Sequence, residues 1–171
     1  PGRGVWISLS RAAIAEAVAK KAFSRAFGAA SAASGDLPEV VGRLLRQQAL
    51  SYVSLAKKAG QAVAGFDKVE DMARRGEAAV LLHAREAAAD GRRKIDRLAG
   101  PGTEIVDFFG VDELDLAFGR SNVIHAALRA GPASKTFLSR CQTLERFRGV
   151  NGADALDSAL EQVGSAGLGN E

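Results

Sequence analysis

The chain has 171 residues, of which 47% are hydrophobic, enough to fill the core of one or two domains. No apolar run approaches the roughly 18 residues that a membrane span needs, so we expect no contact with a membrane. The single cysteine, Cys141, excludes a disulfide within the chain and suits a reducing compartment, so we expect a cytoplasmic protein. Because residue 1 is proline and not methionine, we expect a further segment upstream.

The positive charge is concentrated near the N-terminus. Residues 1–50 contain seven lysines and arginines against three acids, residues 51–131 contain twelve against twelve, and the remainder contains four against five. The net charge of +3 does not by itself indicate a polyanionic partner. Its distribution makes the first fifty residues the most cationic part of the chain.

The first predicted elements are a glycine-rich turn that enters a short strand, over residues 1–7, and a helix over residues 11–27 that Ser8 or Ser10 caps. The cations near the end of this helix are Lys20, Lys21 and Arg25. Two interpretations stay open for them, because a helix end favours cations and because cations also contact RNA phosphates. The aromatic residues Trp6, Phe23 and Phe27 are expected to pack in the core, with Trp6 the better candidate for stacking on a base.

Residues 28–35 are small and predict a linker. A long helix is predicted from Asp36 to Lys58, with proline in its first turn and apolar residues at helical spacing. Its last turn carries two lysines, and glycine follows at the exit. This helix would join an N-terminal and a central module.

The central region alternates helices and strands. Asp67 can cap a helix that Gly76 ends, and the run 79–82 is too short and apolar for a half-exposed strand, so it should be buried on both faces. Further strands are predicted over residues 103–108 and 122–128, and further helices over residues 90–97, 111–118 and 134–148. The predicted fold class is α/β: a three-layer α/β/α sandwich with a mixed sheet, preceded by a small strand-helix module.

The sequence contains no catalytic constellation. Three acids crowd the start of the helix predicted at residues 111–118: Asp112, Glu113 and Asp115. Acids in a first turn ordinarily complement the helix dipole, and they do not by themselves indicate a metal. His83 and His125 each end an apolar strand without partners at zinc spacing, so we expect them to be packed or hydrogen-bonded. Cys141 is expected to be buried in a helix, and we expect no catalytic residue, no metal and no cofactor.

Two motifs define the N-terminal segment: Pro-Gly-Arg-Gly-Val-Trp-Ile at residues 1–7 and Lys-Lys-Ala-Phe-Ser-Arg-Ala-Phe at residues 20–27. They resemble the YlxR-type RNA-binding family of bacteria, in which the two motifs flank a basic cleft. The likeness covers about the second half of such a domain. It implies RNA contacts from Arg3, Lys20, Lys21 and Arg25.

The order helix, short strand, helix, buried strand and helix in residues 45–128 resembles the kink-turn RNA-binding ribosomal-protein family, which has a pelota-like α/β/α fold. In that family RNA docks at the start of the second helix through a Gly-x-Asn-Glu-x-x-Lys pattern. Here Gly65 is kept, whereas Asp67, Lys68 and Asp71 occupy the other three positions, so we expect specific kink-turn recognition to be weakened. The resemblance implies RNA contacts near that end from Lys57, Lys58, Gln61, Gly65, Lys68 and Arg120.

We therefore expect a truncated YlxR-like basic module with linker (1–35), a ribosomal-protein-like RNA-binding domain (36–131), a C-terminal helix (132–149) and a mobile tail (150–171). This combination predicts a bacterial RNA-binding accessory protein, linked to transcription termination or antitermination, or to ribosome and structured-RNA metabolism. The expected partners are structured RNA, ribosomal or another non-coding RNA, and the transcription or ribosome machinery. Two alternatives stay open: the substrate-binding part of an RNA-modifying enzyme, and a protein-protein adaptor.

Overall fold

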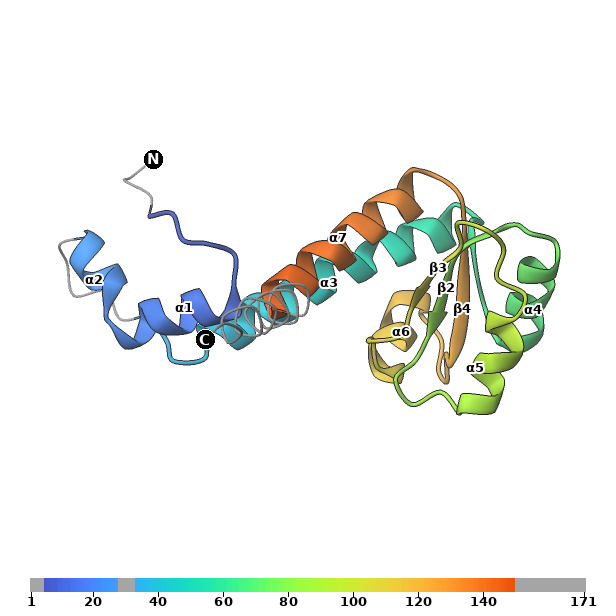
Figure 1. Cartoon of the computed structure of the whole chain (residues 1–171), viewed down its shortest axis with the longest axis horizontal. Coiled ribbons are helices and arrows are strands. Elements are labelled where there is room, and N and C mark those ends of the chain that lie inside the picture. Colours follow the sequence, from blue (N-terminus) through green and yellow to red (C-terminus); the bar gives the residue numbers. More distant parts are fainter. Residues whose placement is uncertain (1–4, 28–32, 150–171) are drawn as a thin grey trace, which may run out of the picture. The chain divides into compact units, whose positions relative to one another are not determined.

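The computed structural model of the chain describes residues 5–27 and 33–149, within which it contains seven helices and four strands (Figure 1). Arg3, residues 28–32 of the predicted linker and the predicted tail at residues 150–171 lie outside the described residues. No helix within the described ranges is both long enough and apolar enough to cross a membrane.

The chain divides into two compact units. Unit 1 consists of the residues up to Arg46 together with those from Cys141 onward, and unit 2 consists of residues 47–140. Both divisions fall inside long helices, α3 (Leu37–Lys58) and α7 (Pro132–Arg148). The long helix predicted from Asp36 to Lys58 is therefore confirmed as α3.

Unit 2 is built on a four-stranded mixed sheet, which confirms the predicted fold class. Its strands are β1 (Ala62–Ala64), β2 (Ala78–His83), β3 (Glu104–Val106) and β4 (His125–Arg129), in the spatial order β1-β4-β2-β3. β2 runs parallel to β3, and β4 runs antiparallel to both β1 and β2. β2 is nearly fully buried, as its unbroken apolar sequence predicts.

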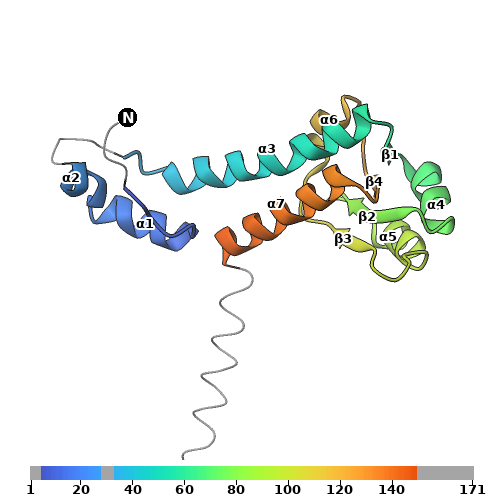
Figure 2. The ribbon, with the colours of Figure 1, turned by 90° about the horizontal axis from the view of Figure 1, so that it is seen from above.

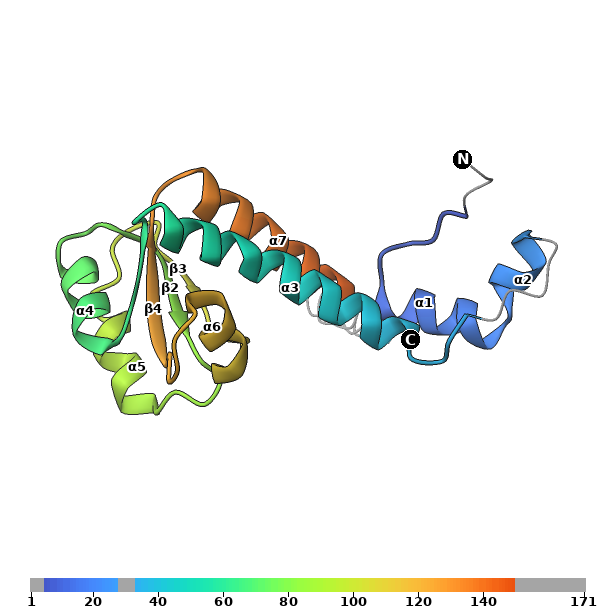
Figure 3. The ribbon, with the colours of Figure 1, turned by 180° about the vertical axis from the view of Figure 1, so that it is seen from behind.

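Helices cover both faces of this sheet. α4 (Phe66–Arg74) and α5 (Ala89–Asp96) lie on one face, and α6 (Val111–Phe118) lies on the other (Figures 1 and 3). On the first face, Leu81 of β2 and Ala127 of β4 pack with buried residues of α4 and α5, including Val69 and Ile95. Because side chains alternate along a strand, Leu82 points toward the opposite face.

Two strands of unit 2 differ from their predicted form. The strand predicted at residues 103–108 is the shorter β3, and its Ile105 is 44% exposed because β3 is an edge strand with one neighbour. The strand predicted at residues 122–128 begins only at His125. The backbone amides of Asn122 and Val123 donate instead to the carboxylate of Asp115, at 2.9 and 2.7 Å, which keeps them out of the ladder.

The N-terminal prediction was wrong in two respects. Residues 5–10 contain no strand, since no described strand lies beside them to pair with. The helix predicted at residues 11–27 is two helices, α1 (Arg11–Ala19) and α2 (Ala22–Phe27). Ser10 is the residue that caps α1, because its hydroxyl accepts a hydrogen bond from the amide of Ala13 at 3.4 Å.

The remainder of unit 1 is formed by the first half of α3 and the last turns of α7. Cys141, Leu144 and Phe147 of α7 are buried, which confirms the predicted burial of the cysteine. A methyl group at Gly42 of α3 would lie 3.2 Å from the Phe147 ring, so glycine permits a close approach of the two helices. Burial raises the pKa of the Cys141 thiol to about 12, so the side chain is a neutral thiol at pH 7.

Candidate nucleic-acid interface

The joint between α1 and α2 carries the three predicted cations of unit 1, and we call it the elbow: Lys20, Lys21 and Arg25. All three are exposed. The guanidinium of Arg25 donates to the carbonyl of Lys20 at 2.8 Å, which satisfies an acceptor at the end of α1. The ammonium of Lys20 lies 2.5 Å from a carboxylate oxygen of Glu16 and lowers the pKa of that acid. The elbow is therefore a built turn and not a frayed helix end.

Lys21 has a left-handed backbone conformation, with a φ of +50°. For a residue with a Cβ this conformation costs roughly 1–2 kcal/mol, and glycine would adopt it freely. Among the described residues Lys21 has no ion-pair partner, in contrast to Lys20. The turn thus accepts backbone strain at a position where it presents an exposed ammonium group.

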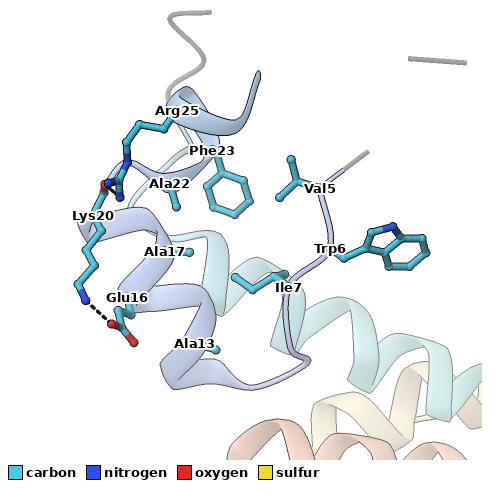
Figure 4. A pocket seen from close by; sticks show the side chains of 10 residues that line it. All are labelled: Val5, Trp6, Ile7, Ala13, Glu16, Ala17, Lys20, Ala22, Phe23 and Arg25. Carbon is cyan, nitrogen blue, oxygen red and sulfur yellow. Dashed lines mark hydrogen bonds and ion pairs between the residues drawn. The ribbon is translucent and has the colours of Figure 1, made fainter. Parts of the chain in front are cut away.

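A groove of about 310 Å³ lies beside the elbow, between the extended segment that precedes α1 and the two helices (Figure 4). Val5 and Ile7 line it from the segment, and Ala17 and Phe23 line it from the helices. Lys20 and Arg25 also contribute to its lining. Phe27, expected in the core, is instead 47% exposed, and Trp6 is 98% exposed.

In unit 2 the structure brings three of the predicted residues to the end of β1 where α4 begins, and we call this the sheet-end surface: Gly65, Lys68 and Arg120. A fourth predicted residue, Lys57, lies in the last turn of α3. β1 joins the end of α3 to the start of α4, and Gly65 follows it as the N-cap of α4 (Figure 2). Arg120 reaches the same point, because its guanidinium approaches the carbonyl of Ala64 at 3.4 Å. The ammonium of Lys57 donates to the carbonyl of Phe118, so it also caps the end of α6.

Gly65 shapes the start of α4. Its φ of +105° and ψ of 146° suit only glycine, and its amide donates to the carbonyl of His125 at 2.9 Å. The prediction that Asp67 caps the helix was wrong, because no side chain of the described residues caps α4 and Asp67 lies within its first turn. The first amides of α4 therefore offer the positive end of the helix dipole beside the exposed Lys68.

The other two predicted contacts lie at the opposite end of β1. The carbonyl of Gln61 accepts a hydrogen bond from the amide of Arg129 at the end of β4, whereas Gly65 pairs with His125 at its start. Lys58 is the last residue of α3 and is exposed. The structure thus separates Lys58 and Gln61 from Gly65 by the length of a short strand.

The cations of α5 form a different kind of surface. Arg92 lies 2.5 Å from Asp107, and Asp90 accepts from Lys94 at 2.9 Å and lies 3.7 Å from Arg93. These pairs neutralise the cations locally, which is typical of a solvated helix face.

The acids at the start of α6 have structural partners. The carboxylate of Glu113 accepts from the amide of Gly110 at 2.9 Å, and Asp115 binds the two amides that precede β4. This supports their interpretation as helix-end and loop partners. Across residues 5–27 and 33–149, no three side chains of His, Cys, Asp or Glu gather as the ligands of a metal would.

The two histidines are buried and bonded to each other, a pairing that the sequence analysis missed. Their Nδ1 atoms lie 2.7 Å apart, and His83 Nε2 lies 2.9 Å from a carboxylate oxygen of Asp96. Because the carboxylate accepts, His83 donates from Nε2 and accepts at Nδ1 from His125. Burial lowers the pKa of both rings, that of His125 to about 4, so the pair is neutral at pH 7.

The comparisons with known proteins give information about the fold alone. No family model matches the chain, and no curated protein matches it. One similar solved structure is a protein of unknown function from Bacillus halodurans C, with a TM-score of 0.50 and 17% identity over 54% of this chain and 94% of that chain. Another is a 15.5 kD RNA-binding protein from Giardia lamblia, with a TM-score of 0.46 and 16% identity over 60% of this chain and 87% of that chain. The first likeness shows that the fold of about half of the chain occurs in another protein.

Proposed function

We propose that the chain is an RNA-binding protein without catalytic activity, which binds RNA phosphates through the elbow and the sheet-end surface. The observation that carries this proposal is Lys21, an exposed lysine held in a strained left-handed turn between two further cations. Strained backbone clusters at functional sites, and three clustered cations suit a polyanion. The expected contacts of Arg3, Lys58 and Gln61 remain part of the proposal.

The finer function follows from the two family resemblances. We infer that the RNA is structured, ribosomal or another non-coding RNA, and that the protein is a cytoplasmic accessory factor. Its role would lie in transcription termination or antitermination, or in ribosome and structured-RNA metabolism. Crosslinking in cells, followed by sequencing of the bound RNA, would identify the RNA and decide between these roles.

A charge-reversal pair tests RNA binding at the elbow. Lys21→Glu and Arg93→Glu change the net charge equally, but Arg93 lies on α5 next to Asp90 and outside both proposed surfaces. With a labelled RNA hairpin, Lys21→Glu should weaken binding at least tenfold, because it places a repulsive charge opposite phosphate, and Arg93→Glu should change it less than threefold. Equal losses in both variants would contradict a local site, and absence of RNA binding by the parent chain would favour the protein-protein adaptor.

A further inference from the structure

Trp6 is the only tryptophan of the chain, and its side chain is 98% exposed. A fully exposed tryptophan is unusual, because burying the large apolar surface of an indole stabilises most folds. The neighbours Val5 and Ile7 are each only 38% exposed and line the groove beside the elbow. The segment is thus attached to unit 1 by the residues on either side of the indole.

The extended backbone explains why the indole points outward. Successive side chains of an extended segment alternate between two sides, so the packing of Val5 and Ile7 toward Phe23 sends Trp6 the other way (Figure 4). A polar residue at position 6 would serve this arrangement equally well. Within the described residues of unit 1, the fold therefore gives no reason for tryptophan at this position, and a ligand would give one.

The charge around the segment favours a nucleic acid as that ligand. Residues 5–27 contain four cations and one acid, and two of the cations, Lys20 and Arg25, line the groove from the helices, on the other side of the segment from the indole (Figure 4). Proteins bind single-stranded nucleic acids by combining cations, which bind the backbone, with an aromatic face on which a base stacks. Residues 5–27 carry both features, an exposed indole and an excess of cations.

We propose that Trp6 stacks on an unpaired nucleobase of the bound RNA while Lys20, Lys21 and Arg25 bind phosphates further along the same strand. This inference rests on the proposed function, and it adds that unit 1 takes a single-stranded segment. The indole can stack only on a base that is not paired and stacked within a duplex, so the site selects unpaired nucleotides. Because every base has a π face, this stacking tolerates any sequence.

The test uses the emission of Trp6, which reports on this site alone because the chain has no other tryptophan. Three dye-labelled probes with equal numbers of phosphates are compared: a single-stranded RNA of about eight nucleotides, an abasic backbone of that length, and a short duplex. Binding is followed independently by the anisotropy of the dye. We expect the single strand to quench Trp6 emission with the same midpoint as the anisotropy, and the abasic backbone and the duplex to bind at least fivefold more weakly without that quenching.

Variants separate stacking from a general loss of apolar surface. Trp6→Ala should weaken single-strand binding about fivefold or more, and Trp6→Phe should restore part of the affinity. Leu116→Ala in α6 is the matched control, since Leu116 is 84% exposed and lies in unit 2 outside the proposed surfaces, and it should bind like the parent chain.

Two results would overturn the inference and leave the proposed function intact: RNA binding without a change in Trp6 emission, or equal affinity for the abasic backbone. Shielding of Trp6 from iodide in the free protein would also overturn it, because another part of the protein would then cover the indole. Absence of binding to all three probes would overturn the proposed function together with the inference.

Discussion

At Lys21, backbone geometry and charge can be separated by substitution. Glycine adopts the φ of +50° without strain, whereas alanine keeps the strain, and both remove the ammonium group. We predict that Lys21→Gly is more stable than Lys21→Ala by about 1 kcal/mol, measured by denaturant unfolding followed by circular dichroism. Both should lose the same RNA affinity, since the phosphate contact depends on the charge. If Lys21→Gly is the less stable of the two, the left-handed turn stores no strain.

The His83–His125 pair predicts an unusual titration. Burial of the imidazoles lowers their pKa in the folded protein, and Asp96 opposes this only in part at His83. The unfolded chain therefore binds more protons than the folded one between about pH 6.5 and pH 4, so stability should fall as the pH falls through this window. For His125, the lowering to about 4 corresponds to at most about 3 kcal/mol.

Nuclear magnetic resonance can follow both rings, because they are the only histidines of the chain. We expect the His125 ring to stay neutral until the pH approaches 4 and to keep its proton on Nδ1. An ordinary titration near pH 6.5 would contradict the buried hydrogen-bonded arrangement. His125→Gln, which cannot titrate, should flatten the pH dependence of stability in the same window.

At the scale of single elements, the start of α4 bears on the kink-turn resemblance. Asp67, Lys68 and Asp71 replace an amide, an acid and a lysine of the family pattern, so two of the three positions change the sign of their charge. We predict little preference for a kink-turn RNA over a duplex of equal length in a competition binding assay. A preference of hundreds-fold, about 3 kcal/mol or more, would show that the backbone of Gly65 and the shape of the sheet end suffice for recognition.

Most elements were predictable because their cause is local. The apolar stripe of α3 and the positions of α6 follow from helical spacing, and β2 follows from an unbroken apolar run. The break at Lys21 was not predictable, because every residue from Arg11 to Phe27 is compatible with helix and the turn depends on Arg25 reaching the carbonyl of Lys20. The hydrogen bond between the histidines was not predictable either, because it depends on the strand register that places His83 opposite His125.

The sequence predicted which residues to propose for the candidate site, but not how the fold arranges them. Helix-end positions and the two family resemblances singled out Lys20, Lys21 and Arg25 together with Gly65 and Lys68, but not the turn that carries the first three. The second role of Lys57, as a cap on α6, arises from a contact 61 residues along the chain. The exposure of Trp6 depends on which residues of the N-terminal segment face the groove. The hydrophobicity of tryptophan alone predicts that Trp6 is buried.

On the scale of the whole chain, two compact units each carry a proposed phosphate-binding surface. The excess charge lies in the first fifty residues, while the acids and bases of residues 51–131 balance. Residues 1–46 of unit 1 should therefore supply most of the electrostatic attraction, and the sheet-end surface should add contacts through Arg120, Lys68 and the amides of α4. In this arrangement the affinity depends on the salt concentration more than on RNA sequence.

Neutralisation of RNA phosphates by the chain can be measured from how its affinity for a structured RNA depends on the salt concentration. If about four to six phosphates are engaged, the logarithm of the association constant should fall against the logarithm of the salt concentration with a slope of roughly −3 to −5. Lys21→Glu should make this slope shallower by about one, since it removes one phosphate contact. A titration that is flat with salt would contradict the account.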